Sequence, residues 1–474
     1  MFARYISQLP EIFLLAITIM MLGVSHFRKS STPKTYFTLS KIGVAVSLFF
    51  TIIFYNQSFD AQWFKNTPYT TLFKTLIYCA ALATFYLGCK WFLNKNRSSL
   101  GYYLPANISL VLLTLAISAQ NLLALFACLE LSFALNIWFI CYGGVDDYPL
   151  PARRRFLSGY VVIFVLFSLG LEMFWRLGIP FDYQEAYHWF EVHHKQDWQS
   201  FGAVMLIVIP LFCMLGIAPF HRWFADVMGV AILPVCTFLT FIPPIAYIAV
   251  LINLFSNVFY PVYGNMQMFV SCCAVLSVII GVIGVNSETG LRNLFAYVSL
   301  YNLGVILICI SFLNDNGLLS GFVSLLVYLL ALFGIYTAFY AFKTRGEYLK
   351  EVKDLAGISE VRPYISAALL IFMVSLTGIP PMLGFLGKLS VINYLIIQGS
   401  YVFIGIILTA LLLLAYAFLN VIKTVYFETR SNIFDRADKG VYICLMINIV
   451  LVLISILNPK YLMHDAEAIL STVL

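Results

Sequence analysis

Long apolar runs separated by short polar stretches fill most of the chain. A helix needs roughly 20 consecutive apolar residues to cross a membrane, and the runs predict fourteen such segments. They cover residues 9–27, 36–56, 70–93, 103–119, 121–142, 155–178, 200–221, 232–255, 265–285, 295–313, 317–342, 363–398, 401–427 and 440–458. The count changes by one if 103–142 or 363–398 is divided differently. The predicted fold is an all-α polytopic membrane protein, with residues 1–474 forming a single integral membrane domain.

Two of these segments contain strong helix breakers. Segment 363–398 is too long for one straight crossing, and Pro380 and Pro381 remove two backbone donors near its centre. The second break is predicted at Pro219, where Gly216 precedes the proline as Gly378 precedes Pro380. Interrupted helices in matching positions indicate an internal repeat with a transport path between its halves.

Composition narrows the class of protein. Hydrophobic residues make up 62% and charged residues 11% of the chain, whereas soluble domains carry about 25% charged residues. The net charge of +6 comes from residues in short loops, so we predict the lipid bilayer as surroundings and no nucleic-acid partner. No nucleotide-binding loop and no Cys-x-x-Cys pair occurs among the ten cysteines, so we expect no cofactor, metal site or disulfide framework in this chain.

Basic residues are unevenly distributed between the loops. The loops after odd-numbered segments are rich in Lys and Arg, as in Arg153–Arg155 and Lys343–Lys353. The loops on the other side are poor in these residues. Cytoplasmic loops carry such an excess, so both termini are predicted on the non-cytoplasmic side.

A few charged side chains lie inside the predicted segments. A carboxylate or ammonium in hydrocarbon is costly and usually marks an ion or proton path, which makes Glu130 and Lys388 the leading candidates. The structural alternatives are a protonated, hydrogen-bonded Glu130 and a Lys388 that extends to the interface. Lys74 lies close to a segment end, so we expect its ammonium to extend to the interface. Glu172 is a weaker candidate because Arg176, four residues on, can pair with it.

Polar residues inside the predicted segments could line a wet path. They are Ser299, Tyr301, Asn302, Ser375 and Thr377. Each could equally form a hydrogen bond between helices.

Several motifs resemble a known family. Pro219-Phe-His221-Arg-Trp-Phe-Ala-Asp226-Val is similar to a signature of the antiporter-like membrane subunits of respiratory complex I, and Ser375–Lys388 resembles their second signature. Leu129-Glu130-Leu131, Arg292–Ser299 and Val421–Glu428 match further segments of the family. Length, Asp226-Val227 and Thr237-Phe238 favour a shorter member over its longer relatives.

The resemblance implies fourteen transmembrane helices and two inverted five-helix repeats with broken helices near 219 and 380. Helices one to three then cover about 9–93, repeat one about 103–255, repeat two about 265–427 and the last helix about 440–458. Glu130 would belong to the fifth-helix ion pair, with Arg154 near the position of its partner. Lys388 would be the twelfth-helix lysine, and His221, Asp226, Asn302, Ser375 and Thr377 could line the path.

The sequence also departs from the family. The expected seventh- and eighth-helix lysines fall at Met214 and Pro244, and a histidine position falls at Asn302. Arg154 can pair with Glu130 but cannot release a proton near neutral pH. These replacements predict that this chain has a divergent or impaired path, or that it routes protons by water and other residues.

The resemblance implies a translocase subunit of an NADH:quinone oxidoreductase in the bacterial cytoplasmic (inner) membrane. Other membrane-arm subunits would be its partners, and the whole complex, not this chain, would use NADH and a quinone. Two alternatives stay open: a subunit of a multi-subunit cation/proton antiporter, and a non-pumping structural subunit of the same complex.

Overall fold

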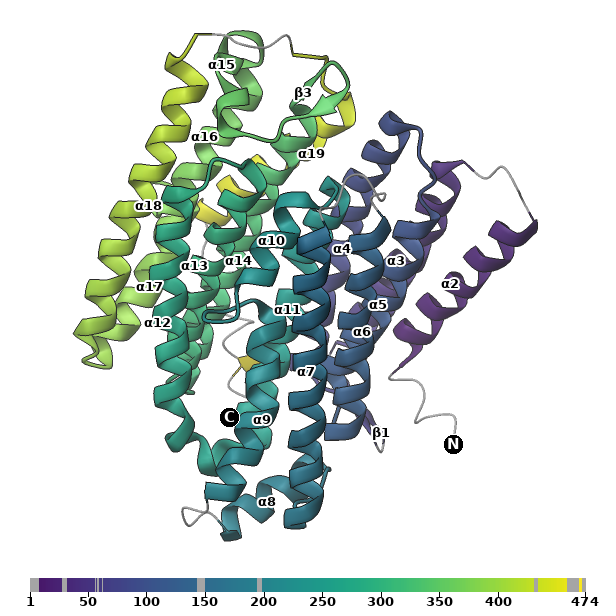
Figure 1. The fold of residues 1–474 in the computed structure, drawn as a ribbon, viewed down its shortest axis with the longest axis vertical. Coiled ribbons are helices and arrows are strands. Elements are labelled where there is room, and N and C mark those ends of the chain that lie inside the picture. The colour runs from purple at the N-terminus through teal and green to yellow at the C-terminus, as the bar shows by residue number, and fades with distance from the viewer. Residues whose placement is uncertain are drawn as a thin grey trace. The chain divides into compact units, whose positions relative to one another are not determined.

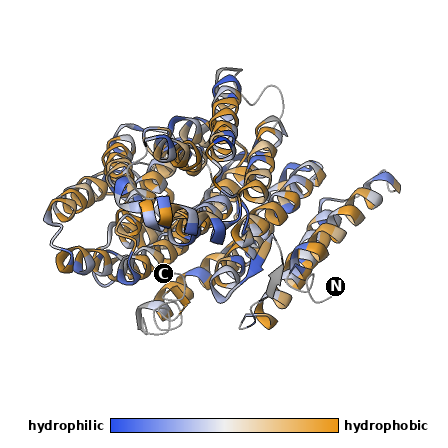
Figure 2. Ribbon diagram, turned by 90° about the horizontal axis from the view of Figure 1, so that it is seen from below, coloured by the Kyte–Doolittle hydropathy of each residue, from blue (hydrophilic) through white to orange (hydrophobic). Residues whose placement is uncertain are grey.

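The computed structural model describes residues 8–27, 32–55, 57, 59–61, 63–142, 150–193, 198–429, 434–457 and 469–470. Within these residues the chain is mainly α-helical (Figure 1). Hydrophobic residues predominate along the helices, as the colours of Figure 2 show. Among the described residues, twelve helices are long and apolar enough to cross a membrane. The predicted class, an all-α polytopic membrane protein, is confirmed.

The long helices follow the predicted segments closely. They are α2 (Leu9–Phe27), α3 (Pro33–Ile53), α4 (Pro68–Lys95), α5 (Leu100–Ser118), α6 (Leu122–Tyr142), α7 (Leu150–Leu177), α9 (Trp198–Leu215), α11 (Leu233–Asn257), α12 (Tyr263–Ser287), α13 (Leu291–Ile310), α14 (Asp315–Ala341), α18 (Tyr401–Phe427) and α19 (Lys439–Leu457). Segment 363–398 is divided into α16 (Pro363–Thr377) and α17 (Leu383–Ile397). The number of crossings and the inverted repeats stay predictions.

Shorter elements connect these helices. They are α8 (Tyr183–His193), α10 (Arg222–Val230), α15 (Ile358–Val361), the 3₁₀ turns η1 (Tyr260–Val262) and η2 (Val352–Leu355), and strands β1 (Phe59–Ala61), β2 (Phe64–Asn66), β3 (Lys343–Thr344) and β4 (Glu347–Tyr348). Strands β1 and β2 pair antiparallel with Asp60 opposite Lys65, and β3 pairs with β4 in the same sense.

The described residues divide into two compact units. Unit 1 comprises those within 1–216 and 230–266, and unit 2 those within 217–229 and 267–471. In unit 1 every residue of Leu233–Ser256 in α11 is buried. In unit 2, α13 and α14 are the most buried of the long helices. The prediction of a single membrane domain is not decided by this division and stays a prediction.

The break near residue 380 occurs where the sequence predicts it. Helix α16 ends at Thr377, and Gly378 takes a left-handed conformation (φ 71°) that a residue with a side chain rarely adopts. Across the break, the Gly384 backbone N–H donates to Ser375 Oγ over 3.2 Å. A Cβ at Gly384 would overlap the carbonyl oxygen of Ser375, so only glycine allows the two half-helices to approach this closely.

The break near residue 219 has a similar construction. Helix α9 ends at Leu215, Gly216 has φ 70°, and α10 begins at Arg222. In unit 2 the Ala218 backbone N–H donates to Ser277 Oγ of α12 over 3.0 Å. Backbone groups freed at membrane depth need such partners, and at both breaks a serine hydroxyl provides one.

Candidate functional site

Lys388 lies in the second half of the broken helix α16–α17. Its side chain is 6% exposed, so the ammonium does not extend to the surface of the protein. Nζ donates to Asn302 Oδ1 over 3.0 Å and lies 4.7 Å from the centroid of the Tyr301 ring. The thiol of Cys309, also on α13, lies within electrostatic range of the ammonium. One neutral amide and one aromatic face therefore hold the charge, and no carboxylate does so among the described residues.

Helix α13 connects the surroundings of Lys388 to the other break in unit 2. The His221 ring, between α9 and α10, lies 6.1 Å from the ring of Tyr297. Tyr297 and Tyr301 are four residues apart, so they share one face of α13. The buried His221 Nδ1 and Tyr301 hydroxyl have no hydrogen-bond partner among the described residues. An ordered set of groups that can accept or donate protons thus runs from His221 to Lys388.

Three other residues predicted to line the path, Ser375, Thr377 and Asp226, are not among the contacts of Lys388 described above. Ser375 is fully buried and accepts from Gly384 across the break, whereas Thr377 donates to the Val374 carbonyl of its own helix. Asp226 is half-buried on α10, five residues beyond His221. The structure therefore brings Asn302 to Lys388, whereas Ser375 joins the two half-helices and Thr377 bonds within its own helix.

Glu130 is buried on α6 in unit 1, with 4% of its surface exposed. Neither carboxylate oxygen has a hydrogen-bond partner among the described residues. Tyr160 of α7 and Tyr247 of α11 lie within electrostatic range of it, and the Tyr247 hydroxyl contacts the Ser132 side chain. The carboxylate is thus surrounded by neutral hydroxyl groups rather than by a cation.

The predicted ion pair between Glu130 and Arg154 is not formed. Arg154 is exposed on the first turns of α7, and no ion pair joins it to Glu130 in the described part of the chain. The reason is helical geometry, because Phe156, two residues on, points into the protein and the Arg154 side chain points away from it. Met214 and Pro244, at the expected lysine positions, are both buried in unit 1 and have no group that can change its charge.

Sequence reasoning missed a buried ion pair in unit 1. Lys74 Nζ lies 2.6 Å from Glu11 Oε1, and each side chain is only 2% exposed. The expectation that Lys74 extends to the interface is therefore wrong. Both residues lie within predicted membrane segments, and the rarity of charges there is the signal that would have paired them.

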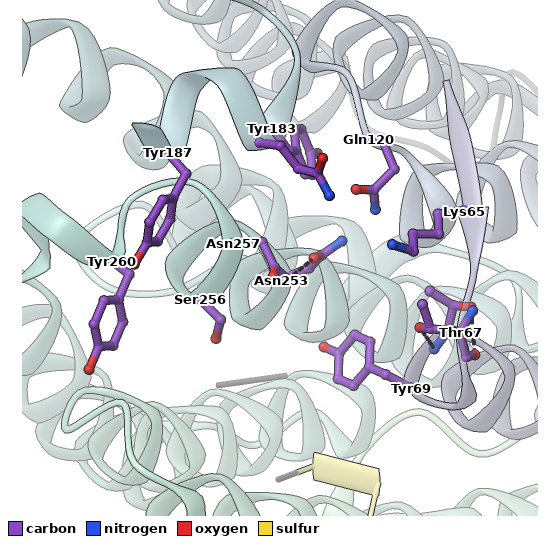
Figure 3. Close-up of a pocket in the computed structure, with 12 residues that line it drawn as sticks. Lys65, Thr67, Tyr69, Gln120, Tyr183, Tyr187, Asn253, Ser256, Asn257 and Tyr260 are labelled. Carbon is purple, nitrogen blue, oxygen red and sulfur yellow. Dashed lines mark hydrogen bonds between the residues drawn. The ribbon is translucent and has the colours of Figure 1, made fainter. Parts of the chain in front are cut away.

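A polar pocket of about 450 Å³ lies in unit 1, where α4 begins, α11 ends and α8 lies nearby (Figure 3). All twelve residues that line it are polar: Lys65, Thr67, Tyr69, Thr70, Gln120, Tyr183, Gln184, Tyr187, Asn253, Ser256, Asn257 and Tyr260. Burial raises the pKa of Tyr183 well above its ordinary value, so this phenol stays protonated. Such a lining favours water or another polar occupant in an otherwise apolar chain.

The sequence was compared with protein families and with named relatives. The family described as "NADH:quinone oxidoreductase/Mrp antiporter, TM" matches residues 154–414, which is more than half of the chain. NADH-quinone oxidoreductase subunit N of Rhodospirillum rubrum is 25% identical over 480 residues, covering 97% of this chain and 96% of the relative. The protein of the same name from Wolbachia sp. subsp. Brugia malayi is 28% identical, covering 94% and 96%.

Solved structures share the fold at low sequence identity. A chain of respiratory complex I from Thermus thermophilus with bound aureothin matches with a TM-score of 0.80 and 19% identity, covering 95% of this chain and 97% of that one. A chain of the Mrp complex from Dietzia sp. gives 0.83 and 14%, covering 98% and 97%. A chain of the archaeal membrane-bound sulfane sulfur reductase gives 0.84 and 16%, also covering 98% and 97%. Because three kinds of complex contain this fold, the fold alone does not select among their functions.

Proposed function

The chain belongs to the NADH:quinone oxidoreductase/Mrp antiporter family of membrane proteins, and from this premise we propose that it is a proton-translocating membrane-arm subunit of an NADH:quinone oxidoreductase, corresponding to subunit N. The near full-length similarity to relatives of that name supports the choice of complex. NADH oxidation and quinone reduction would take place in other subunits, and this chain would translocate protons without a cofactor of its own.

The observation that carries the proposal is the environment of Lys388. A buried ammonium held by a neutral amide can lose its proton without leaving an unpaired carboxylate behind. Protonated Lys388 donates to Asn302, and the neutral amine can accept a proton from a water or a hydroxyl nearby. Lys388 can therefore hold a proton in the membrane and release it, as a translocation step requires.

The route along α13 gives this step a direction. Protons would enter near His221, pass the hydroxyl groups of Tyr297 and Tyr301 with water between them, and reach Lys388. Each group on this route can donate or accept a hydrogen bond. Unit 2 alone therefore contains a plausible set of carriers from one helix break to the other.

The proposed location follows from the loops. The excess of basic residues on one side supports insertion in the bacterial cytoplasmic membrane with both termini on the non-cytoplasmic side. Other membrane-arm subunits are the proposed partners.

Two other functions have a specific observation in their favour. A subunit of a multi-subunit cation/proton antiporter is favoured by the match to the Mrp complex structure. A non-pumping structural subunit of the same complex is favoured by Met214, by Pro244 and by the absence of a cation next to Glu130 among the described residues.

Gentle solubilisation of the tagged protein tests the choice of complex. We expect NADH:quinone reductase activity to migrate with the tagged chain on a native gel. Migration of the chain without NADH oxidation would refute the assignment, and cation-dependent proton flux in vesicles would then identify an antiporter subunit.

A further inference from the structure

The buried ion pair Glu11–Lys74 joins the first described helix of the chain to α4. Its two charges lie 2.6 Å apart at 2% exposure, while Glu11 Oε2 has no hydrogen-bond partner in the part of the chain that the structure describes. A carboxylate oxygen left without a donor in the membrane is costly, and water is the usual donor where one can reach it.

A row of polar side chains runs from the pair along one face of α4. Thr70, Lys74 and Tyr78 are spaced four residues apart, so they lie one above the other. Thr70 Oγ1 donates to Asn66 Oδ1 over 3.1 Å, and the Tyr78 hydroxyl lies 3.5 Å from Thr114 Oγ1 of α5. All five side chains are buried in surroundings that are otherwise apolar.

The end of this row nearest the start of α4 meets the polar pocket of unit 1, because Thr70 lines that pocket. A volume of about 450 Å³ has room for several water molecules. The hydroxyl of Ser256, which is 7% exposed and also lines the pocket, has no hydrogen-bond partner among the described residues. Figure 3 shows how it lies among the other lining side chains, and water in the pocket would satisfy it.

We propose that the Glu11–Lys74 pair is a second proton-exchange site of this subunit, which takes up and releases protons through water in the pocket lined by Thr70 and Ser256. This inference rests on the proposed function. In the ionic state the pair has no net charge. A hydronium ion in the pocket gives up its proton, which would reach Glu11 through water beside Thr70, because Glu11 itself does not line the pocket. Water then remains in the pocket and a carboxylic acid stands beside the Lys74 ammonium. Release returns the proton to a pocket water.

Few other groups act on the pair. Tyr78 of α4 is the titratable side chain that the structure places within electrostatic range of Glu11. Helix α3 contributes the Ser47 hydroxyl, which donates to the Pro10 carbonyl over 2.7 Å, and α5 contributes Thr114. None of these side chains competes with Lys74 as a cationic partner.

The alternative is that the pair only fixes α2 to the bundle. Replacing a buried ion pair by apolar residues of similar volume is often neutral or stabilising, whereas removing one partner leaves an uncompensated charge. The double variant Glu11→Leu/Lys74→Met therefore removes both groups that can bind a proton and keeps the packing. Thr70→Val blocks access from the pocket and leaves the pair intact. Glu172→Gln, in the exposed pair Glu172–Arg176, is the matched control.

The variants are compared in vesicles that contain the whole complex, as protons transferred per NADH oxidised. We expect the double variant and Thr70→Val each to lose as much transfer as Lys388→Ala does, with no further loss when either is combined with Lys388→Ala. The control should transfer protons as the wild type does. Full transfer by the assembled double variant would show that the pair is only structural. If the double variant fails to assemble, Thr70→Val decides: full transfer by that variant overturns the proposal.

A second measurement does not depend on the redox complex. Infrared spectroscopy of the purified protein during a pH titration should show a carboxylic-acid band that Glu11→Gln removes. Absence of any band assigned to Glu11 would overturn the proposal even where NADH oxidation migrates with the chain. A band present in a protein without NADH oxidation would refute only the proposed complex.

Discussion

Two buried charged side chains, Glu130 in unit 1 and Lys388 in unit 2, have opposite kinds of surroundings. The Lys388 ammonium has a hydrogen-bond acceptor in Asn302 and an aromatic face in Tyr301. Both oxygens of Glu130 lack a hydrogen-bond donor among the described residues, and the expected cation, Arg154, is exposed elsewhere on α7. The protein therefore stabilises the ammonium of Lys388 in unit 2. The charged form of Glu130 in unit 1 depends on water or neutral hydroxyl groups instead.

The two units therefore differ in the groups that they offer to a proton path. In unit 2, Tyr297 and Tyr301 of α13 lie between His221 at one helix break and Lys388 of α17, and each of the four has a group that can carry a proton. Unit 1 has buried Met214 and Pro244 where the family resemblance implies lysines. Proton transfer should accordingly depend more strongly on unit 2 than on Glu130.

The largest expected effect is that of Lys388→Ala. The complex should assemble and oxidise NADH, while the whole contribution of this subunit to protons transferred per NADH is lost, because no other described group in unit 2 occupies the place of the ammonium. Lys388→Arg keeps the charge but cannot release a proton near neutral pH, so it should lose the same contribution. Acidification of vesicles, measured together with NADH oxidation, checks both variants.

Glu130→Gln is the comparison variant in the same assay. We expect a smaller loss than with Lys388→Ala, since no charged partner forms a hydrogen bond with Glu130 among the described residues. A loss as large as that of Lys388→Ala would contradict the contrast between the two units.

An intermediate effect is expected for Asn302→Leu. The variant removes the acceptor of the Lys388 ammonium, and a hydrogen bond to a charged group contributes about 1.5–3 kcal/mol. The protonated state of Lys388 is destabilised by that amount, so the initial rate of proton transfer should fall about tenfold or more. Asn302→Asp retains an acceptor and strengthens the hold on the proton, so it should slow release instead. An unchanged rate in Asn302→Leu would mean that this hydrogen bond is not part of the path.

The sequence predicts the helix breaks well because their signals are local. Proline alone does not locate a break, because prolines also lie inside the continuous helices α5, α9 and α11. Pro219 and Pro380, however, each follow a glycine with positive φ, Gly216 and Gly378, and this local combination locates both breaks. The same holds for the long apolar segments, whose lengths are set by the bilayer.

Pairing between distant residues was predicted less well. Lys388 and Asn302 were both candidates, but the hydrogen bond between them depends on how α13 packs against α17. The pair Glu11–Lys74 is not predicted, because the position of Lys74 close to a segment end suggests that its ammonium extends to the interface. Side-chain partners across helices are set by packing, which a single sequence does not specify.

The smallest effect, and the one that tests the loss in unit 1 directly, is that of Met214→Lys. Met214 is the second-last residue of α9, and a lysine in a membrane helix costs up to about 2.5–3.5 kcal/mol, so less assembled complex is expected. Met214→Leu is the matched control, because a swap that conserves volume usually costs under about 1.5 kcal/mol and adds no titratable group.

If the missing seventh-helix lysine limits the path through unit 1, each assembled Met214→Lys complex should transfer more protons per NADH than the wild type. The gain should be modest, because Pro244 still stands where a second lysine is expected. Among the described residues, Glu130 also still has no hydrogen-bonded cation beside it. It should also vanish when Glu130→Gln is added, since the new ammonium would then have no carboxylate to exchange a proton with. Unchanged transfer in Met214→Lys would show instead that protons pass unit 1 by water and other residues, or do not pass it at all, and that the subunit depends on the groups along α13.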